Sequence, residues 1–210
     1  VVLAAGSGKR MGTSVHKQYL LIKGKPVIYY TLRAFELSEV DEIILVTGAD
    51  EIDYCSREIV EKYNFQKVRA VIAGGKERYD SVYEGLKHVT SDYVMIHDGA
   101  RPFVKKDLLD RLVVGMEEHK AVLAMVPCKD TIKRVKDGKV VETLIRSELM
   151  QAQTPQAFDT VLIRNAYKEA IENNIQATDD ASMLELQGKD VYVVEGDYDN
   201  IKITTKEDLK

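Results

Sequence analysis

Short apolar runs alternate with longer amphipathic stretches along the chain. Predominantly hydrophobic runs are typical of strands buried on both faces of a parallel sheet. The predicted strands are Val1 to Ala5, Ile43 to Thr47, Val68 to Ala73, Tyr93 to His97, Ala121 to Val126 and Val191 to Glu195. The predicted helices are Pro26 to Leu37, Ile52 to Tyr63, Tyr79 to Val89, Lys106 to His119, Val161 to Glu172 and Asp180 to Gln187. This order predicts an α/β fold with a doubly wound, mostly parallel sheet and helices on both faces.

One segment departs from this alternation. Residues 131–145 alternate imperfectly around Asp137-Gly138, a dipeptide that favours the two-residue turn of a β-hairpin. We therefore expect a β-arm at about residues 129–150 that projects from the sheet. Apolar residues on a projecting ribbon need cover, which a second copy of the chain would provide, so the arm predicts a homodimer. The alternative is a hairpin that folds back onto its own domain.

Length and composition narrow the class of protein. A chain of 210 residues is long enough for one well-buried core, so we expect a single domain over residues 1–210. No run approaches the roughly 18 consecutive apolar residues of a membrane span, and we expect no membrane partner. The net charge of -4 argues against a protein that coats nucleic acid, which needs a basic face. An anionic ligand must therefore be met by local cations.

The cysteines and the chain ends bear on location. Cys55 and Cys128 lie far apart and fit no metal-binding spacing, which favours a reducing, cytoplasmic setting. The first five residues lack the charged start and long apolar region of a secretory signal. Because the chain starts within a predicted strand and ends just after a possible helix start, we expect it to be a piece of a longer protein.

A glycine-rich turn follows the first predicted strand. It covers residues 3–12 and includes Gly6 and Gly8. Small residues let backbone N–H groups approach a polyphosphate closely. Arg10 and Lys17, in or just after the turn, can neutralise the phosphate charge. The turn therefore predicts phosphate binding, although glycines alone would also suit a tight connection between a strand and a helix.

Two other nucleotide-binding motifs do not match this turn. A P-loop requires Ser or Thr after its Gly-Lys pair, but Arg10 follows Gly8-Lys9. A dinucleotide-binding turn requires the spacing GxGxxG, whereas Gly6, Gly8 and Gly12 leave a longer last interval. Neither a P-loop enzyme nor an NAD-binding protein is therefore predicted.

Asp98 is the candidate metal ligand. It follows the apolar run 93–96, so it is expected at the carboxyl end of a central strand, where open α/β sheets bind ligands. A carboxylate that faces a triphosphate is repelled unless a cation intervenes, so we predict that Asp98 binds Mg²⁺. The alternative is an aspartate that caps a helix or braces a loop. His97 is expected to be a structural hydrogen-bonding residue rather than a base, and the histidines show no zinc-binding spacing.

Several short motifs occur in one order along the chain. They are residues 3–12 with Lys17-Gln18-Tyr19 behind, Gly74 to Arg78 with Ser81-Val82, His97 to Pro102, Lys129 to Lys133, Ala152 to Gln156, Thr178 to Ser182, and Asn200 to Thr205. In this order and spacing the chain resembles the 2-C-methyl-D-erythritol 4-phosphate cytidylyltransferases of the non-mevalonate isoprenoid route. The resemblance implies a Rossmann-like nucleotidyltransferase fold, CTP and a polyol phosphate as substrates, and transfer of CMP with release of pyrophosphate.

The catalytic candidates are cations. Nucleotidyl transfer is accelerated mainly by alignment and by stabilising charge on the α-phosphate and the leaving pyrophosphate. Arg10 and Lys17 are the candidates for that work, together with Mg²⁺, and the resemblance implies the same two positions. It also implies that Lys202 and Arg146 orient the phosphate of the polyol substrate.

The resemblance implies further substrate contacts. In relatives the arm crosses to the neighbouring subunit, so Arg146, Arg101 and Thr131 are expected to complete the partner's site. Thr154 resembles a residue that contacts substrate hydroxyls. The residues expected around the nucleotide are Gly75 and Ser81 at the base, Ala4, Ala5 and Gly6 along the pocket, and Gly8 and Arg78 nearby. For at least one of Asp179 and Asp180 we expect a helix-capping or first-turn role.

Two other functions remain open at this point. Ribitol 5-phosphate cytidylyltransferase would share the fold, CTP, Mg²⁺ and most of these residues. The segment Thr178 to Ser182 and the context Ala152-Gln153-Thr154 favour the methylerythritol enzyme. A non-catalytic module that binds CTP would be expected to lack one or more of the charged residues, yet all of them are present.

Overall fold

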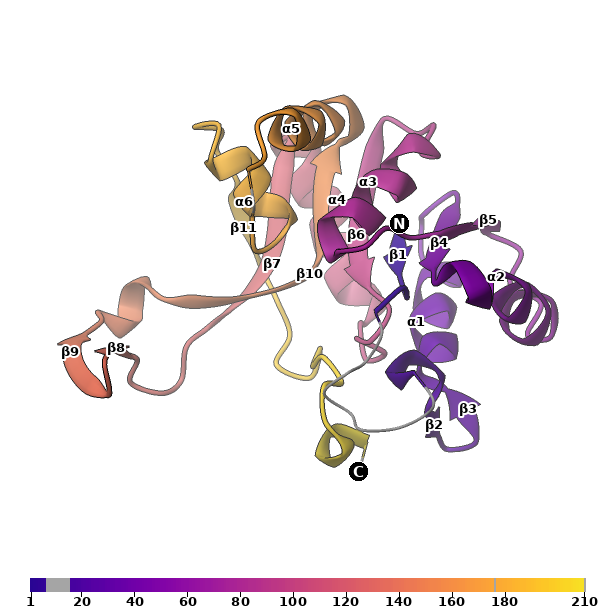
Figure 1. The fold of residues 1–210 in the computed structure, drawn as a ribbon, viewed down its shortest axis with the longest axis horizontal. Helices are drawn as coiled ribbons and strands as arrows, with labels where there is room; N and C mark the ends of the chain where they lie inside the picture. The colour runs from indigo at the N-terminus through magenta and orange to yellow at the C-terminus, as the bar shows by residue number, and fades with distance from the viewer. Residues whose placement is uncertain (7–15, 176, 210) are drawn as a thin grey trace.

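The computed structural model describes residues 1–6, 16–175 and 177–209 (Figure 1). In this part of the chain seven strands form one sheet in the order β11-β7-β10-β6-β1-β4-β5. Their bounds are Val2–Leu3 (β1), Ile43–Thr47 (β4), Val68–Ala73 (β5), Tyr93–Asp98 (β6), Ala121–Pro127 (β7), Met150–Asp159 (β10) and Tyr192–Glu195 (β11). Neighbouring strands are parallel except around β10, which is antiparallel to both β6 and β7. The prediction of a doubly wound, mostly parallel sheet is confirmed.

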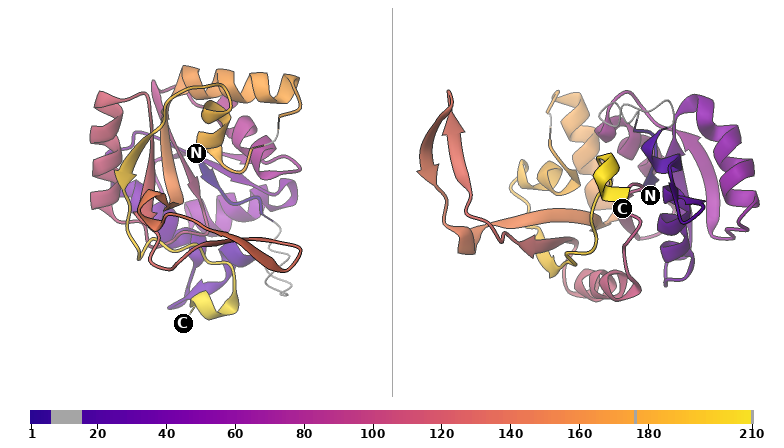
Figure 2. Two further views of the ribbon diagram at one scale, coloured as in Figure 1. Left: turned by 90° about the vertical axis from the view of Figure 1, so that its left-hand side faces the viewer. Right: turned by 90° about the horizontal axis from the view of Figure 1, so that it is seen from below.

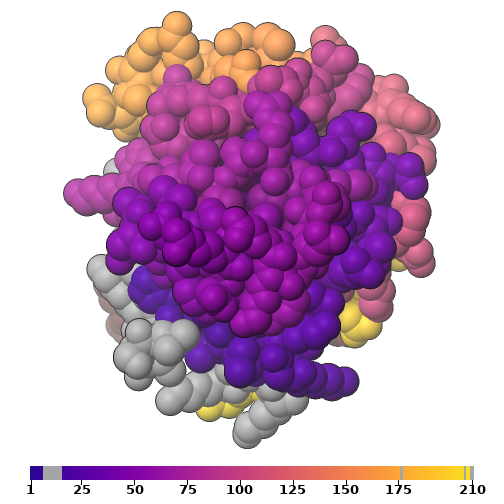
Figure 3. All heavy atoms as spheres, turned by 90° about the vertical axis from the view of Figure 1, so that its right-hand side faces the viewer, coloured from indigo at the N-terminus to yellow at the C-terminus, as the bar shows by residue number. Residues whose placement is uncertain are grey.

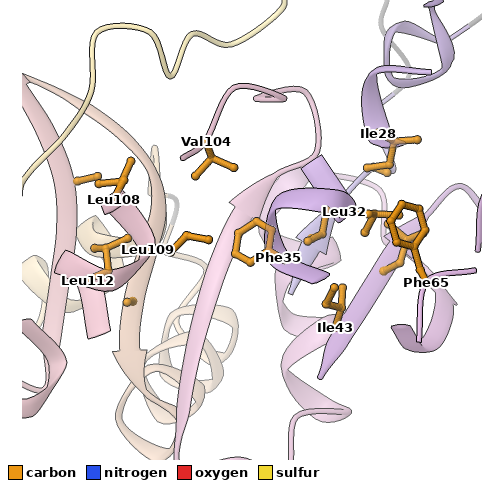
Figure 4. Packing of buried hydrophobic residues seen from close by; sticks show 14 of the residues in the cluster. Ile28, Leu32, Phe35, Ile43, Phe65, Val104, Leu108, Leu109 and Leu112 are labelled. Atoms are coloured by element: carbon orange, nitrogen blue, oxygen red, sulfur yellow. The ribbon is translucent and has the colours of Figure 1, made fainter. Parts of the chain in front are cut away.

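Helices cover both faces of the sheet. One face carries α1 (Val27–Glu36), α2 (Ile52–Tyr54) with its π-helical continuation η4 (Cys55–Glu61), and α4 (Lys106–Glu118). The other face carries α3 (Arg78–Lys87), α5 (Thr160–Glu172) and α6 (Asp180–Glu185). Figure 4 shows the first core, in which Phe35 of α1 lies beside the leucines of α4. No helix within the described ranges is long and apolar enough to cross a bilayer.

Strand β4 shows why the sequence pattern succeeds for the central strands. Ile43 and Leu45 belong to the core under α1 and α4, whereas Ile44 and Val46 belong to the core under α3 and α5. Successive side chains of a strand point to opposite faces. Since both faces are covered, every position of this strand is buried and the sequence is apolar throughout.

The hydrophobic pattern predicted no strand at residues 150–159, but this segment forms β10 in the middle of the sheet. This strand buries the polar residues Gln153, Thr154 and Gln156, and its pairing with β7 shifts register between Ala152 and Gln156. Side-chain hydrogen bonds compensate the burial, for example the 2.8 Å bond from Gln153 Nε2 to the carbonyl oxygen of Asp197. A hydrophobic pattern therefore does not reveal the strand.

The short hairpin of β2 (Leu21–Ile22) and β3 (Lys25–Pro26) was also not predicted.

The predicted arm is a hairpin of β8 (Lys133–Lys136) and β9 (Lys139–Thr143). Asp137 and Gly138 at its tip have φ values of 50° and 73°, as the predicted two-residue turn requires. The hairpin stands away from the sheet rather than folding back onto it (Figures 1 and 2). It exposes apolar side chains along its length, namely Val135, Val140, Val141 and Ile145. Cover by a second copy of the chain stays a prediction.

Candidate active site

A cavity of about 390 Å³ lies at the carboxyl ends of the parallel strands. The turn after β1, the 3₁₀ helix η2 (Lys17–Tyr19), the β5–α3 connection and the end of β6 contribute to its walls. Doubly wound sheets bind their ligands at this end. The cavity brings together nine residues that were predicted as site residues: Ala4, Ala5, Gly6, Lys17, Gly75, Arg78, Ser81, Asp98 and Lys202.

The described lining of this cavity carries an excess of positive charge. Four lysine and arginine side chains (Lys17, Lys76, Arg78 and Lys202) face two carboxylates (Glu77 and Asp98). Another cavity, of about 310 Å³, lies toward the amino ends of β4 and β6 and has largely apolar walls. Only the first of these two cavities therefore has the charge to hold a polyphosphate.

Asp98 is the buried carboxylate of the charged cavity. Its Oδ2 lies 2.7 Å from Lys202 Nζ, and its Oδ1 lies 3.3 Å from Arg78 Nε. Burial by itself would raise the pKa of Asp98, but the charges of Arg78 and Lys202 outweigh it and hold this pKa well below its usual range. Asp98 is therefore ionised at neutral pH and links two cations from distant parts of the chain.

Arg78 joins Asp98 to a second buried carboxylate, Asp180. The two terminal nitrogens of Arg78 each lie 2.8 Å from an oxygen of Asp180, whose side chain is fully buried. The Tyr167 hydroxyl donates a further hydrogen bond to Asp180. Asp180 is thus a fixed partner of Arg78, whereas Asp179 caps α6 by accepting from the Ser182 N–H. The capping role expected for at least one of the pair is confirmed for Asp179.

His97 and Thr154 form a hydrogen-bonded chain behind Asp98. The Thr154 hydroxyl accepts from the Asp98 N–H at 3.0 Å, so its own proton is directed to His97 Nδ1 at 3.1 Å. His97 Nε2–H can then donate to the carbonyl oxygen of Arg101, 3.1 Å away. Burial lowers the pKa of His97 to about 4, which agrees with a neutral ring. His97 therefore has the structural role expected of it.

The β5–α3 connection is tightly built around Ser81. The Gly75 N–H donates to Ser81 Oγ at 3.1 Å, and Ser81 Oγ donates to the Glu77 carbonyl oxygen at 3.1 Å. A side chain at Gly75 would place its Cβ 2.2 Å from the Cβ of Asp80. Only glycine fits there, and the backbone at this end of the cavity stays accessible to a ligand.

Comparison with known proteins decides the family. The family model for 2-C-methyl-D-erythritol 4-phosphate cytidylyltransferase matches residues 1–210, which is the whole chain. The chain belongs to this family. Curated cytidylyltransferases of the same description from Alkaliphilus metalliredigens and Clostridium beijerinckii are 48% and 50% identical to it, and each alignment covers 100% of this chain and 88% or 93% of the relative.

Solved structures agree with the family and the fold. The 4-diphosphocytidyl-2C-methyl-D-erythritol synthase from Anaerococcus prevotii has a TM-score of 0.86 at 36% identity, covering 99% of this chain and 92% of that one. The cytidylyltransferase from Thermus thermophilus has a TM-score of 0.81 at 27% identity, covering 100% and 94%. The resemblance, the fold and the assignment to the nucleotidyltransferase enzymes are confirmed.

Some predicted site residues of this cytidylyltransferase lie elsewhere. Thr131 and Arg146 are exposed on the segment that carries the arm, where Arg146 Nη1 donates to the Lys129 carbonyl oxygen at 3.0 Å. Arg101 Nη1 donates at 2.7 Å to the carbonyl oxygen of Asn200 in the same chain. Thr154 lies behind Asp98, with its hydroxyl held by His97. Gly8 and Arg10 lie outside the described residues, and the roles of all these residues stay predictions.

The cytidylyltransferase cavity also contains residues that were not predicted. Gln18 lines it and donates from Nε2 to the carbonyl oxygen of Ala4 at 2.6 Å. The other lining residues that were not predicted are Leu3, Lys76, Glu77 and Ala100. Gln18 stood inside a motif but was not assigned a role, because an uncharged side chain gives no chemical signal in a sequence.

The buried His97 of the cytidylyltransferase predicts how stability changes with pH. Its pKa is about 4 in the fold against about 6.5 in an unfolded chain, so acid protonates the unfolded state first. The contribution of neutral His97 to the free energy of unfolding is fully present above pH 6.5, the pKa in the unfolded chain. It decreases by about 3 kcal/mol in total as the pH falls from 6.5 to 4. In His97→Gln we expect the free energy of unfolding to depend less steeply on pH in this window, measured by urea unfolding. His88→Gln, at an exposed position, is the control, and an unchanged slope in His97→Gln would contradict the assignment.

Proposed function

We propose that the chain transfers CMP from CTP to 2-C-methyl-D-erythritol 4-phosphate, giving 4-diphosphocytidyl-2-C-methyl-D-erythritol and pyrophosphate in isoprenoid precursor synthesis. The observation that carries the proposal is the positively charged cavity at the carboxyl ends of the strands, in a chain whose whole length matches the family. Two polyanionic substrates must meet during this reaction. A cavity that gathers Lys17, Arg78 and Lys202 lowers the repulsion between them.

The proposed chemistry needs no covalent intermediate with the protein. A phosphate oxygen of the polyol attacks the α-phosphorus of CTP, and the bond between that phosphorus and the oxygen bridging to the β-phosphate breaks. Lys17, with Arg10 from the same region of sequence, stabilises the charge on the α-phosphate and on the leaving pyrophosphate. Lys202 holds the phosphate of the second substrate and is itself fixed by Asp98 at 2.7 Å.

The described residues fit a Mg²⁺ ion that is held mainly by the nucleotide. Among them, no group of three His, Cys, Asp or Glu side chains is close enough to bind a metal alone. Mg²⁺ in phosphoryl-transfer sites takes most of its ligands from phosphates and water and needs only one or two carboxylates. Asp98, ionised and lining the cavity, supplies such a carboxylate. The ion would neutralise charge on the triphosphate.

A panel of substrates tests the proposal. The purified protein is incubated with CTP, Mg²⁺ and either 2-C-methyl-D-erythritol 4-phosphate or ribitol 5-phosphate. The rate of pyrophosphate release is then measured for each substrate. We expect the methylerythritol substrate to have the higher kcat/KM. Faster turnover of ribitol 5-phosphate would favour the related enzyme. Binding of CTP without turnover of either polyol phosphate would favour a non-catalytic module.

The proposed homodimer gives a complementation test. If Arg146 on the arm completes the partner's site, Lys17→Ala and Arg146→Ala homodimers are each impaired at both of their sites. A mixed dimer then contains one intact site, so refolding the two variants together should restore about a quarter of the wild-type activity. No recovery, in a mixture where mixed dimers are demonstrated by mass spectrometry, would show that Arg146 does not act across the interface.

We also propose a cytoplasmic location. The support is chemical, because neither Cys55 nor Cys128 is in a disulfide, and such thiols persist in reducing compartments. Fractionation of cells that express the tagged protein tests the proposal. We expect the protein in the cytoplasmic fraction, and its recovery from the periplasm or the medium would contradict the proposal.

A further inference from the structure

Lys17 reaches the cavity from a very short element that other parts of the fold hold in place. It is the first residue of the three-residue helix η2. Its neighbour Gln18 is buried and donates from Nε2 to the Ala4 carbonyl oxygen at 2.6 Å. Ala4 in turn donates its N–H to Val46 of β4 at 2.6 Å. The middle of η2 is therefore bonded to the same turn that lines the cavity.

Tyr19 fixes the carboxyl end of η2. Its side chain is buried, and its hydroxyl lies 3.0 Å from Thr47 Oγ1 and 3.1 Å from Cys55 Sγ. Thr47 is the fully buried last residue of β4, and Cys55 begins η4. A buried hydroxyl that lost these partners would be left without hydrogen bonds, so the contact also fixes the position of the ring.

Glu51 fixes the amino side of the same element. Its Oε1 accepts from His16 Nδ1 at 2.6 Å, directly before Lys17 in the chain. Its Oε2 accepts from the Thr47 hydroxyl at 3.2 Å and from the Gly48 N–H at 3.1 Å. Its side chain is only 13% exposed, so water competes weakly for these bonds. Thr47 thus connects Glu51 to Tyr19.

These contacts form a closed path from His16 to Glu51 to Thr47 to Tyr19, which we name the η2 clamp. It starts one residue before Lys17, ends two residues after it, and runs through the junction between β4 and α2. Figure 3 shows the side of the molecule opposite the arm, where the violet region of the chain that includes α2 and η4 forms much of the surface. The clamp therefore connects an outer part of the fold to a residue of the cavity.

We propose that Glu51 and Tyr19 are positioning residues for the transfer reaction, because the η2 clamp holds the backbone of Lys17 at the cavity. A lysine carries its charge on a flexible stem with high rotamer entropy, so a backbone that is held in place limits the volume that the charge can sample. A displacement of about 1 Å at a reacting group can lower a rate by about a hundredfold. The proposal rests on the proposed function, since it requires that Lys17 acts on the substrates.

The test compares kcat, KM and melting temperature in variants of the full chain. We expect Glu51→Ala to lower kcat by about ten- to a hundredfold and Tyr19→Phe by about three- to tenfold, with KM changed less than about threefold. Glu51→Gln should recover most of the rate, because its amide oxygen still accepts from Thr47 and Gly48, and its amide N–H can donate to His16 Nδ1 in the tautomer that leaves this nitrogen without a hydrogen. The matched controls are Glu58→Ala, at an exposed position of η4, and Tyr54→Phe, whose ring packs against that of Tyr19. Both controls should leave kcat unchanged.

A double-mutant cycle separates positioning from a general structural effect. In a Lys17→Ala background, Glu51→Ala and Tyr19→Phe should lower kcat by less than about twofold, because the group that they position is absent. Unchanged kcat in both folded single variants would overturn the proposal, and so would an equal loss with and without Lys17. If Glu51→Ala does not fold, Tyr19→Phe, which keeps the ring, decides by the same criteria. Full activity of Lys17→Ala would instead refute the role of Lys17 in the proposed function.

Discussion

Replacing Lys17 by alanine is expected to lower kcat for CMP transfer by about 10²–10³, equivalent to about 2.7–4 kcal/mol of activation free energy, the cost of removing one donor to a developing oxyanion. Lys17 lines the cavity together with Ala4 to Gly6, Asp98 and Lys202. Its charge is needed most as pyrophosphate leaves, so kcat should fall more than the affinity for CTP. Steady-state kinetics of pyrophosphate release, with CTP binding by calorimetry, measures both effects.

The control for Lys17→Ala is Lys62→Ala. Lys62 is exposed just after η4 and pairs with Glu58 at 2.9 Å, so the variant removes the same charge outside the cavity. It should keep wild-type kinetics. A Lys17→Ala enzyme with normal kcat and weakened CTP binding would contradict the assignment, since Lys17 would then stabilise the bound substrate and the transition state equally.

Replacing Arg78 by alanine is expected to lower the free energy of unfolding by about 3–5 kcal/mol, because breaking a buried ion pair leaves an uncompensated charge. The substitution removes a partner from two buried carboxylates. Arg78 contacts both oxygens of Asp180 and one oxygen of Asp98. Chemical denaturation at pH 7 measures the loss.

Arg69→Ala is the matched control for Arg78→Ala. Arg69 makes a 2.7 Å ion pair with Glu42, but nearly half of its side chain is exposed, so its removal should cost less than about 1 kcal/mol. Arg78→Lys should be intermediate, because lysine keeps the charge but cannot make the bidentate contact. A stability of Arg78→Ala equal to that of Arg69→Ala would show that Asp180 does not depend on Arg78.

The parallel part of the fold follows from the sequence, and the antiparallel part does not. Central strands such as β4 are buried on both faces and therefore have an apolar sequence. Strand β10 also lies at the centre, but Gln153 and Gln156 are buried in it because distant groups satisfy them, such as Asp179, which accepts from Gln156 Nε2 at 2.8 Å. Such compensation depends on residues far away in the chain, which no local pattern contains.

Some residues of the candidate site could likewise be predicted from local sequence patterns, whereas the contacts between distant residues could not. The glycine-rich turn after the first strand and an aspartate at a strand end lead to Gly6 and Asp98 from the residue pattern alone, because topology places them together. The dependence of Arg78 on Asp180 could not be predicted, since 102 positions separate the two residues. The hairpin pattern around Asp137-Gly138 located the arm, and the resemblance located Gly75 and Lys202. The sequence contains no sign that Lys202 meets Asp98.

A crystal structure with CTP and Mg²⁺ tests the central claim most directly. We predict the triphosphate beside the backbone of Ala4 to Gly6 and within reach of Lys17, with the cytosine at Gly75 and Ser81 and the metal beside Asp98. Phosphates bound away from the turn after β1, for example at the cavity near the amino ends of β4 and β6, would contradict it.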